Sequence, residues 1–386
     1  MKSILIAAMI SLAGAAYAQQ TLTVIDQDYE LARQTAQQQQ KLLIVDFYTT
    51  WCVPCKILDK TIFQNDSIAG EISKNFVVLK YDAEKDSLHH LSLKHHVCSY
   101  PTTVVLTGEG RLIHKMFGTG GNKPLVDNYT ALLRESIQRH KQGKYIEGFS
   151  ATIDPDIYPA FYKKYVCRTA DIKPGDLDNY WKNNKDLQSE VSLAILAYFG
   201  KAPEQVTRYF VQHKADYEKR FGKADVQFII NRIAAEKFGD AIAAKDEARY
   251  NAAVKFAQQH LPPGDVRQYL SVYSLEMDIA KGAWNKVSAH IAEQVRRKAI
   301  NANEINYFCW IIYEKCYDKK VIRYAVQLMK EVTDTNTSFA MLDTYARLLA
   351  RDNHKQEATA VMKRAIAIGK ANNEDTKESE EALSKF

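Results

Sequence analysis

The sequence predicts an α/β domain, in which helices cover both faces of a mixed central sheet, followed by an all-α domain of helical repeats. Between about residues 19 and 145, short apolar runs alternate with amphipathic segments, as expected when strands and helices follow one another. Beyond about residue 150, nearly every segment has helical periodicity. The length of 386 residues also suits two domains better than one.

Each element of the first domain has its own pattern. Apolar runs predict buried strands at residues 42–48, 76–81, 102–107 and 112–117. Helical periodicity predicts helices at residues 29–40, from 52 to about 60, and at 68–74, 88–95 and 125–140. Gly108, Glu109 and Gly110 separate the last two strands and predict a hairpin there. A terminal hairpin after alternating elements makes the expected sheet mixed.

The second half contains a repeat near its end. When the chain is shifted by 33 residues, Cys309 and Cys316 superpose on Leu342 and Leu349, and residues 325, 328 and 329 superpose on 358, 361 and 362. This period, with its pairs of helices, resembles tetratricopeptide-like repeats, which suit a protein-binding role.

These patterns define the expected domains. The α/β domain is expected at residues 19–145, and a linker containing glycine and proline at 146–160. The helical domain is expected at 161–370, and the polar segment 371–386 as a flexible tail.

The first 18 residues have the composition of a secretory signal peptide. Lys2 precedes an apolar run, and small residues lead to a cleavage site after Ala18. The alternative is a membrane anchor, but the run is shorter than the roughly 20 residues that span a bilayer. We therefore expect an exported, periplasmic protein.

Composition excludes some function classes. The net charge of +6 is not concentrated in a basic block, so we expect no binding to nucleic acid or DNA. Six cysteines in 386 residues are too few for a disulfide scaffold, but an exposed pair would meet oxidising conditions after export.

The segment Trp51-Cys52-Val53-Pro54-Cys55-Lys56 has the pattern of a reversible dithiol. If a helix begins at Cys52, its unpaired N–H groups and dipole favour a thiolate there. Cys55 lies one turn further on, where side chains are neighbours at ~5–6 Å, a separation that suits a disulfide. Pro54 is tolerated in a first helical turn. We therefore expect Cys52 to attack and Cys55 to resolve.

Two further candidate site features are found at predicted strands, one within a strand and one just before a strand. Asp46 interrupts the apolar run 42–48, and it is either a strand-end surface residue or a buried proton acceptor behind Cys55. Tyr100-Pro101 lies at a strand entrance, where an X-Pro bond can be cis.

Together, these residues resemble the thioredoxin superfamily over about residues 25–140. The resemblance rests on Asp46, the segment 51–56, the strand with Asp82-Ala83-Glu84 after it, Tyr100-Pro101-Thr102 and Gly118. Within this superfamily, the sequence most resembles exported thioredoxin-like proteins related to the reductase domain of the transmembrane electron conductor. The resemblance implies that Pro101 is cis and presents the backbone of Tyr100 to an extended substrate. It also implies that Asp46 is the buried acid and that Trp51 shields the pair.

The match has two departures. Val53-Pro54 replaces the Gly-Pro of cytoplasmic thioredoxins, so the reduction potential does not transfer. The lysine that partners the buried acid in the family has no clear counterpart, because Lys80 lies nearby but in a different register.

The other cysteines and the histidines have competing interpretations. A structural zinc site needs four ligands, and neither a second Cys-x-x-Cys nor a His-x₃-His is present, so no metal and no cofactor are expected. His89, His90, His95 and His96 lack the i, i+4 spacing of a metal pair and are expected on an exposed polar face. Cys98 is either a regulatory thiol or a quiet loop residue.

Cys309 and Cys316 are too far apart along one helix for a disulfide, because seven residues rise ~10.5 Å and bridged Cα atoms lie within ~7 Å. They are expected in the core, and so is Cys167.

The predicted function is that of an exported thiol–disulfide oxidoreductase, a reductase of protein disulfides. Trp51 and Val53 are expected to line an apolar rim, and Tyr100 and Pro101 to bind the substrate. The expected partners are disulfide-containing proteins and a membrane-borne reductant or oxidant. The alternative is a binding scaffold, in which the helical repeats hold a protein and the first domain mainly docks partners.

Overall fold

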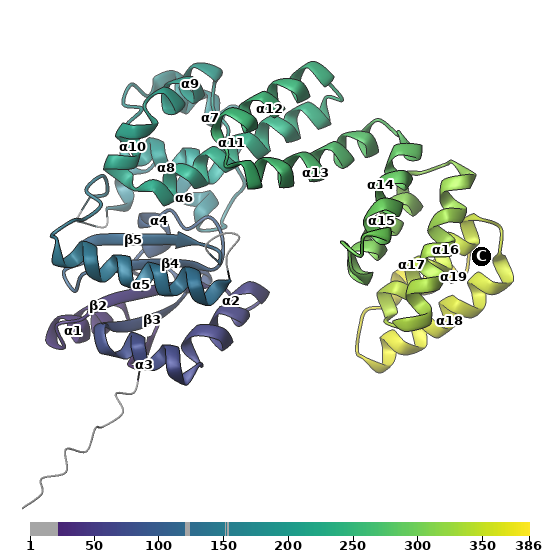
Figure 1. Ribbon diagram of the computed structural model, residues 1–386, viewed down its shortest axis with the longest axis horizontal. Helices are drawn as coiled ribbons and strands as arrows, with labels where there is room; N and C mark the ends of the chain where they lie inside the picture. Colours follow the sequence, from purple (N-terminus) through teal and green to yellow (C-terminus); the bar gives the residue numbers. More distant parts are fainter. Residues whose placement is uncertain (1–21, 120–123, 151, 153) are drawn as a thin grey trace, which may run out of the picture. The chain divides into compact units, whose positions relative to one another are not determined.

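The computed structural model describes residues 22–119, 124–150, 152 and 154–386 (Figure 1). The expected signal peptide at 1–18 lies outside these residues. Contacts divide the chain into two compact units, one ending at Glu236 and the other comprising Lys237–Phe386. Within the described ranges, no helix combines the length and the apolar character needed to cross a bilayer.

A five-stranded sheet forms the centre of the first unit (Figure 1). Its order is β1-β3-β2-β4-β5, and its strands are β1 (Val24–Asp26), β2 (Leu42–Tyr48), β3 (Phe76–Asp82), β4 (Thr102–Leu106) and β5 (Leu112–Phe117). β1, β3 and β2 run parallel, whereas β4 is antiparallel to both β2 and β5. The mixed sheet and its hairpin are therefore confirmed. The three-residue strand β1 was not predicted.

Side-chain alternation along β2 separates two cores, one on each face of the sheet. Leu43, Val45 and Phe47 pack with α1 (Tyr29–Gln38). Leu42 and Ile44 face the opposite way, toward the helices α2 (Val53–Leu58), α3 (Asp66–Asn75) and α5 (Leu125–Lys141) and the π-helical turn η1 (Asp59–Phe63). Asp46 follows the same alternation, so it lies on the face that α2 and η1 cover.

The first unit also contains further helices, and some of them contact the sheet domain through polar and aromatic side chains. They are α6 (Ala160–Val166), α7 (Asp176–Asn183), α8 (Glu190–Phe199), α9 (Glu204–Gln212), α10 (Lys214–Phe221) and the first part of α11 (Lys223–Ala243). Lys115 of β5 forms a buried ion pair of 2.7 Å with Asp225 of α11. Lys94 of α4 (Leu91–Lys94) forms another, of 2.8 Å, with Glu190 of α8.

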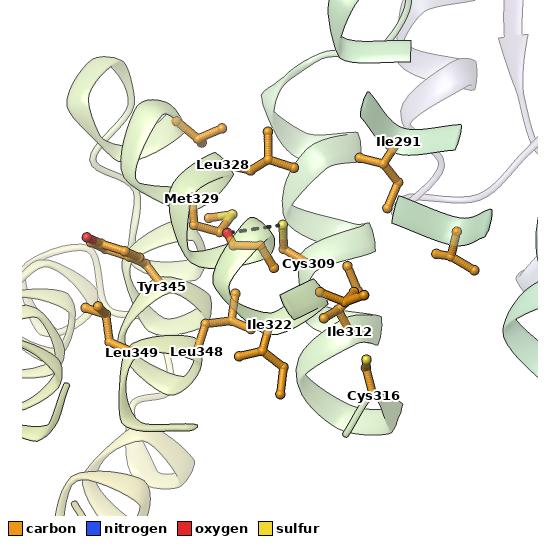
Figure 2. Close-up of a cluster of buried hydrophobic side chains, with 14 of the residues drawn as sticks. Ile291, Cys309, Ile312, Cys316, Ile322, Leu328, Met329, Tyr345, Leu348 and Leu349 are labelled. Atoms are coloured by element: carbon orange, nitrogen blue, oxygen red, sulfur yellow. Dashed lines mark hydrogen bonds between the residues drawn. The ribbon is translucent and has the colours of Figure 1, made fainter. Parts of the chain in front are cut away.

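The second unit is helical throughout its described residues. After the end of α11 it contains α12 (Glu247–His260), α13 (Pro263–Ala280), α14 (Trp284–Arg296), α15 (Ala302–Lys315), α16 (Lys319–Thr335), α17 (Phe339–Arg351), α18 (Lys355–Ala371) and α19 (Lys377–Leu383). Figure 2 shows Cys309 and Cys316 among the buried side chains of its core, as predicted. The positions that the 33-residue shift superposes lie on or next to α15 to α18, and most of them are buried.

The end of the chain differs from the expected flexible tail. α19 lies within it, and Ala382 packs with the core of α17 and α18. The Ser379 hydroxyl donates a buried hydrogen bond of 2.6 Å to the carboxylate of Asp343. These contacts hold a segment whose polar composition alone does not indicate burial.

Candidate active site

Cys52 and Cys55 form a disulfide at the start of α2, with their Cα atoms 5.3 Å apart. Cys52 is the N-cap of the helix, and its sulfur accepts the backbone N–H of Cys55 at 3.2 Å. Both residues are buried, Cys52 at 3% and Cys55 at 1% exposure, so burial alone does not distinguish the attacking sulfur. Free N–H groups at a helix N-terminus favour a thiolate on the N-cap residue, which here is Cys52.

A loop before β4 lies beside this helix start. The Tyr100–Pro101 peptide bond is cis, and the Thr102 hydroxyl donates to the Ser99 carbonyl at 2.7 Å. The Pro101 carbonyl accepts the N–H of Gly118 at 2.8 Å. Gly118 has a φ of +58°, a left-handed conformation that glycine adopts without strain. The hairpin partner β5 therefore holds the cis-proline loop in place.

Exposed apolar side chains lie close to the two cysteines in the sequence. Trp51 is 58% exposed, Val53 63% and Ile57 53%. Large apolar groups left in water on one patch mark a surface that binds another molecule. Ile57 was missed from the sequence, although its place four residues after Val53, on the same face of the helix, is a usable signal.

Two charged residues that sequence reasoning missed hold Trp51. Its indole N–H donates to the Glu84 carboxylate at 3.0 Å, and Arg168 forms an ion pair with the same carboxylate. The Arg168 guanidinium lies 5.6 Å from the centre of the Trp51 ring, within the range of cation–π attraction. The Tyr100 ring meets Trp51 edge-on at 6.1 Å. Arg168 follows α6 and comes from outside the predicted α/β domain, so only tertiary contacts identify it.

Asp46 is fully buried and forms an ion pair with Lys80. The two residues lie directly opposite each other in the β2–β3 pairing, so the sequence-based conclusion that Lys80 is out of register was wrong. The Lys80 ammonium also binds Asp59 of η1. Asp46 is thus not a strand-end surface residue but one end of a buried Asp46–Lys80–Asp59 cluster.

Burial raises the pKa of Asp46, and the neighbouring Lys80 only partly offsets this shift. For Lys80, burial lowers the pKa, but the two carboxylates outweigh it and the net pKa is raised. The second carboxylate oxygen of Asp46, Oδ1, has no hydrogen-bond partner among the described residues. A buried carboxyl with a raised pKa keeps its proton to higher pH than an exposed aspartate does.

The remaining thiols are less suited to redox chemistry. Burial raises the pKa of Cys98 to about 12, so its thiol stays protonated at neutral pH, which favours the quiet interpretation. Cys167 was predicted to lie in the core, but it is exposed at the end of α6. The Cys309 sulfur contacts the Ala325 carbonyl at 3.8 Å within the helical core.

The histidine cluster also differs from its predicted place on an exposed polar face. His95 and His96 are buried, and burial lowers the pKa of both imidazoles well below the usual value. His96 contacts Tyr158 at 3.3 Å and Phe149 in the segment that precedes α6, which explains why a local pattern could not predict its burial. No group of three potential metal ligands occurs among the residues that the structure describes.

Comparison with known proteins agrees with this geometry. A protein family described as thioredoxin-like matches residues 24–108. Thioredoxin-1 of Drosophila melanogaster is 42% identical over 72 residues, which make up 19% of this chain and 63% of that protein. The thiol:disulfide interchange protein DsbD of Yersinia pestis (strain Pestoides F) is 31% identical over 87 residues, 22% of this chain and 14% of that protein.

The solution structure of a thioredoxin from Thermus thermophilus aligns with 32% of this chain and 94% of its own, at 19% identity and a TM-score of 0.28. The chain spans less than two thirds of the length of the curated thioredoxins that it matches. The N-terminal region is thus a thioredoxin-like domain of the kind found in thioredoxins and thiol:disulfide interchange proteins, and many helices follow it.

Proposed function

We propose that this protein is a thiol–disulfide oxidoreductase that reduces disulfides in other proteins. One observation carries the proposal. The Cys52–Cys55 disulfide stands at a helix N-terminus beside a cis-proline loop and an apolar rim. Among the described residues, Cys52 and Cys55 form the one disulfide, and the other four cysteines are free thiols.

The reaction follows from the roles of the two sulfurs. In the reduced protein, the Cys52 thiolate attacks one sulfur of a client disulfide, and the other client sulfur leaves as a thiolate. The Cys55 thiol, losing its proton to Asp46, then attacks the Cys52 sulfur and releases the second client thiolate. The client gains two electrons, and the Cys52–Cys55 disulfide is regenerated. A dithiol donor must reduce it before the next cycle, and we propose a membrane-borne one.

Residues 1–18 support export, since a lysine, an apolar run and a small-residue cleavage site follow one another. We propose removal of the segment after Ala18 and a periplasmic location. N-terminal sequencing of the protein purified from its native cells tests this directly, and a chain that begins at Met1 would contradict it.

The second unit supports a complementary role as a binding surface for proteins. Its helix pairs leave a hollow of ≈ 840 Å³ lined by residues that include Trp310, Tyr313, Arg347 and Phe386. Aromatic and arginine side chains are the ones that most often dominate protein interfaces. If the repeats alone carried the function, a chain without both cysteines would still rescue a deletion strain.

The variant Cys55→Ser tests the exchange mechanism. Without a resolving thiol, the mixed disulfide on Cys52 should accumulate in cells and appear as adducts on non-reducing gels. A matched Cys98→Ser variant should capture nothing beyond the unaltered protein. Absence of adducts with Cys55→Ser would refute the mechanism.

The reduction potential of the pair sets the direction of the reaction. A value near the −270 mV of thioredoxin is expected for a reductase, whereas one near the −120 mV of strong periplasmic oxidants would mean that the protein donates disulfides. Equilibrium titration followed by alkylation and mass spectrometry measures it.

A further inference from the structure

A pocket of ≈ 560 Å³ lies within the first unit, next to the cis-proline loop. The thioredoxin-like domain supplies Cys98 and Tyr100 to its lining, and later helices and the segment after α6 supply Arg168, Asp171, Tyr198 and Arg232. A thioredoxin-like domain alone would lack most of this lining. The pocket therefore exists because the helices from α6 to α11 pack on the domain.

The pocket adjoins the dithiol through shared side chains. Tyr100 lines the pocket, precedes the cis proline and packs edge-on against Trp51, the residue immediately before Cys52. Arg168 also lines the pocket while its guanidinium stands over the Trp51 ring. Trp51 and Tyr100 therefore lie between the dithiol and the pocket.

The lining contains two arginines and one carboxylate. Arg232 is half-buried, and Nη2 of its guanidinium donates to the Tyr198 carbonyl at 2.7 Å. A guanidinium has five N–H donors, so most remain available. In the described part of the chain, no carboxylate lies within ion-pair distance of Arg232. Arg168 adds a second positive charge, which it shares with Glu84, and Asp171 is the single carboxylate of the lining.

We propose that this pocket binds an acidic side chain of the client protein, close in sequence to the client cysteine that Cys52 attacks. The proposal rests on the proposed exchange function and names its substrate class, disulfides flanked by aspartate or glutamate. Arg232 is the anchor, because a half-buried charge is screened less by water than an exposed one. Arg168 lies at the edge of the pocket next to Trp51 and is a positioning residue for that side chain.

The test uses the full chain with Cys55→Ser, so that the reaction stops after one exchange. Synthetic peptides carry one cysteine as a mixed disulfide with thionitrobenzoate, and the Cys52 thiolate displaces that group to form a peptide–Cys52 disulfide. The released thionitrobenzoate anion is followed by its absorbance. Three peptides differ only in having Glu, Gln or Lys a few residues from the cysteine.

We expect the Glu peptide to react about fivefold faster than the Gln peptide, and the Lys peptide to be slowest. A partly exposed ion pair gives an effect of this size. Arg232→Gln should remove the preference for Glu over Gln, and Arg232→Lys should retain part of it. Arg134→Gln, which removes an exposed arginine of α5, should keep the full preference. If Arg232→Gln does not fold, Arg168→Gln serves as a second variant. It should weaken the preference for the Glu peptide.

The outcomes separate the two proposals. Equal rates for the three peptides with the unaltered pocket would overturn the acidic subsite and leave the exchange function standing. A preference that survives Arg232→Gln and Arg168→Gln would assign it to another surface and equally overturn the subsite. If no peptide releases thionitrobenzoate, both the exchange function and the subsite fall.

Discussion

At the scale of single residues, the Asp46 carboxyl of β2 is the buried end of the cluster with Lys80 and Asp59. It is fully buried, one of its oxygens is held by Lys80, and the other has no partner in the described chain. Burial raises its pKa, so its neutral and charged forms are closer in free energy at neutral pH than those of an exposed aspartate. This position suits a group that accepts a proton from Cys55 and later returns it.

Replacing this carboxyl should slow exchange at its second step. For Asp46→Asn we expect resolution of the mixed disulfide by Cys55 to be about 10²-fold slower, because a positioned proton acceptor contributes that much. Rapid mixing with a client disulfide, followed by acid quenching, measures the resolution rate. The exposed Asp127→Asn is the control. An unchanged resolution rate for Asp46→Asn would exclude Asp46 as the proton acceptor.

The same variant should change how stability depends on pH. The pKa of Asp46 is raised in the folded protein, so its stabilising contribution is complete below the unfolded pKa and is lost as the pH rises through the folded pKa. The asparagine side chain that replaces it does not titrate. The free energy of unfolding of Asp46→Asn, relative to the original chain, should therefore increase from acid to neutral pH. A pH-independent difference in urea unfolding would argue against a raised pKa.

At the scale of elements, two buried ion pairs attach later helices to the thioredoxin-like domain. Lys115 and Asp225 are both 1% exposed and pair at 2.7 Å, while Lys94 and Glu190 pair at 2.8 Å. Burial raises the pKa of Asp225 and lowers that of Lys94, which shows that both charges were removed from water. Breaking such a pair leaves an uncompensated buried charge.

Asp225→Ala should therefore destabilise the first unit by about 3–5 kcal/mol, the cost of leaving Lys115 buried and unpaired. Urea unfolding measures it. The exposed pair Lys163–Asp156 provides the control, and Asp156→Ala should cost no more than about 1 kcal/mol. The double variant Lys115→Met/Asp225→Leu should be less destabilised than Asp225→Ala. If Asp225→Ala were as stable as its control, the ion pair would not hold α11 on the sheet.

At the scale of the whole molecule, the chain divides near Glu236 and not at the linker expected at 146–160. Ile146 and Tyr158, both within that expected linker, are buried, and the Tyr198 hydroxyl donates to the Val97 carbonyl of the domain. The helices from α6 to the first part of α11 therefore belong to the compact unit that contains the dithiol. We propose the end of α11 as the practical boundary for separating the two units.

Shortened chains test this boundary. A fragment of residues 22–145 loses the partners of Lys94 and Lys115, so its thermal unfolding should occur well below that of a fragment of residues 22–243. Circular dichroism during heating compares them, and insulin reduction reports whether the dithiol still works. Equal unfolding temperatures for the two fragments would mean that α6 to α11 are merely appended to a self-sufficient domain.

Much of the fold and part of the site were predictable because their signals are local. Apolar runs mark β2 to β5, the spacing of Cys52 and Cys55 marks the dithiol, and Pro101 precedes a strand. β1 was missed because three residues form no pattern. Lys80 was misjudged because the register of two parallel strands depends on how they align in the sheet, which neither strand encodes alone.

The sequence by itself determined the elements, the dithiol and its helix, since period and spacing act over a few residues. Only the tertiary structure decided what covers them. Arg168 meets Glu84 across 84 positions of sequence, and Lys115 meets Asp225 across 110. His96 likewise is buried against Tyr158, much later in the chain. Such contacts arise from packing between distant elements, where charge pairing and desolvation are decided by neighbours that no local pattern specifies.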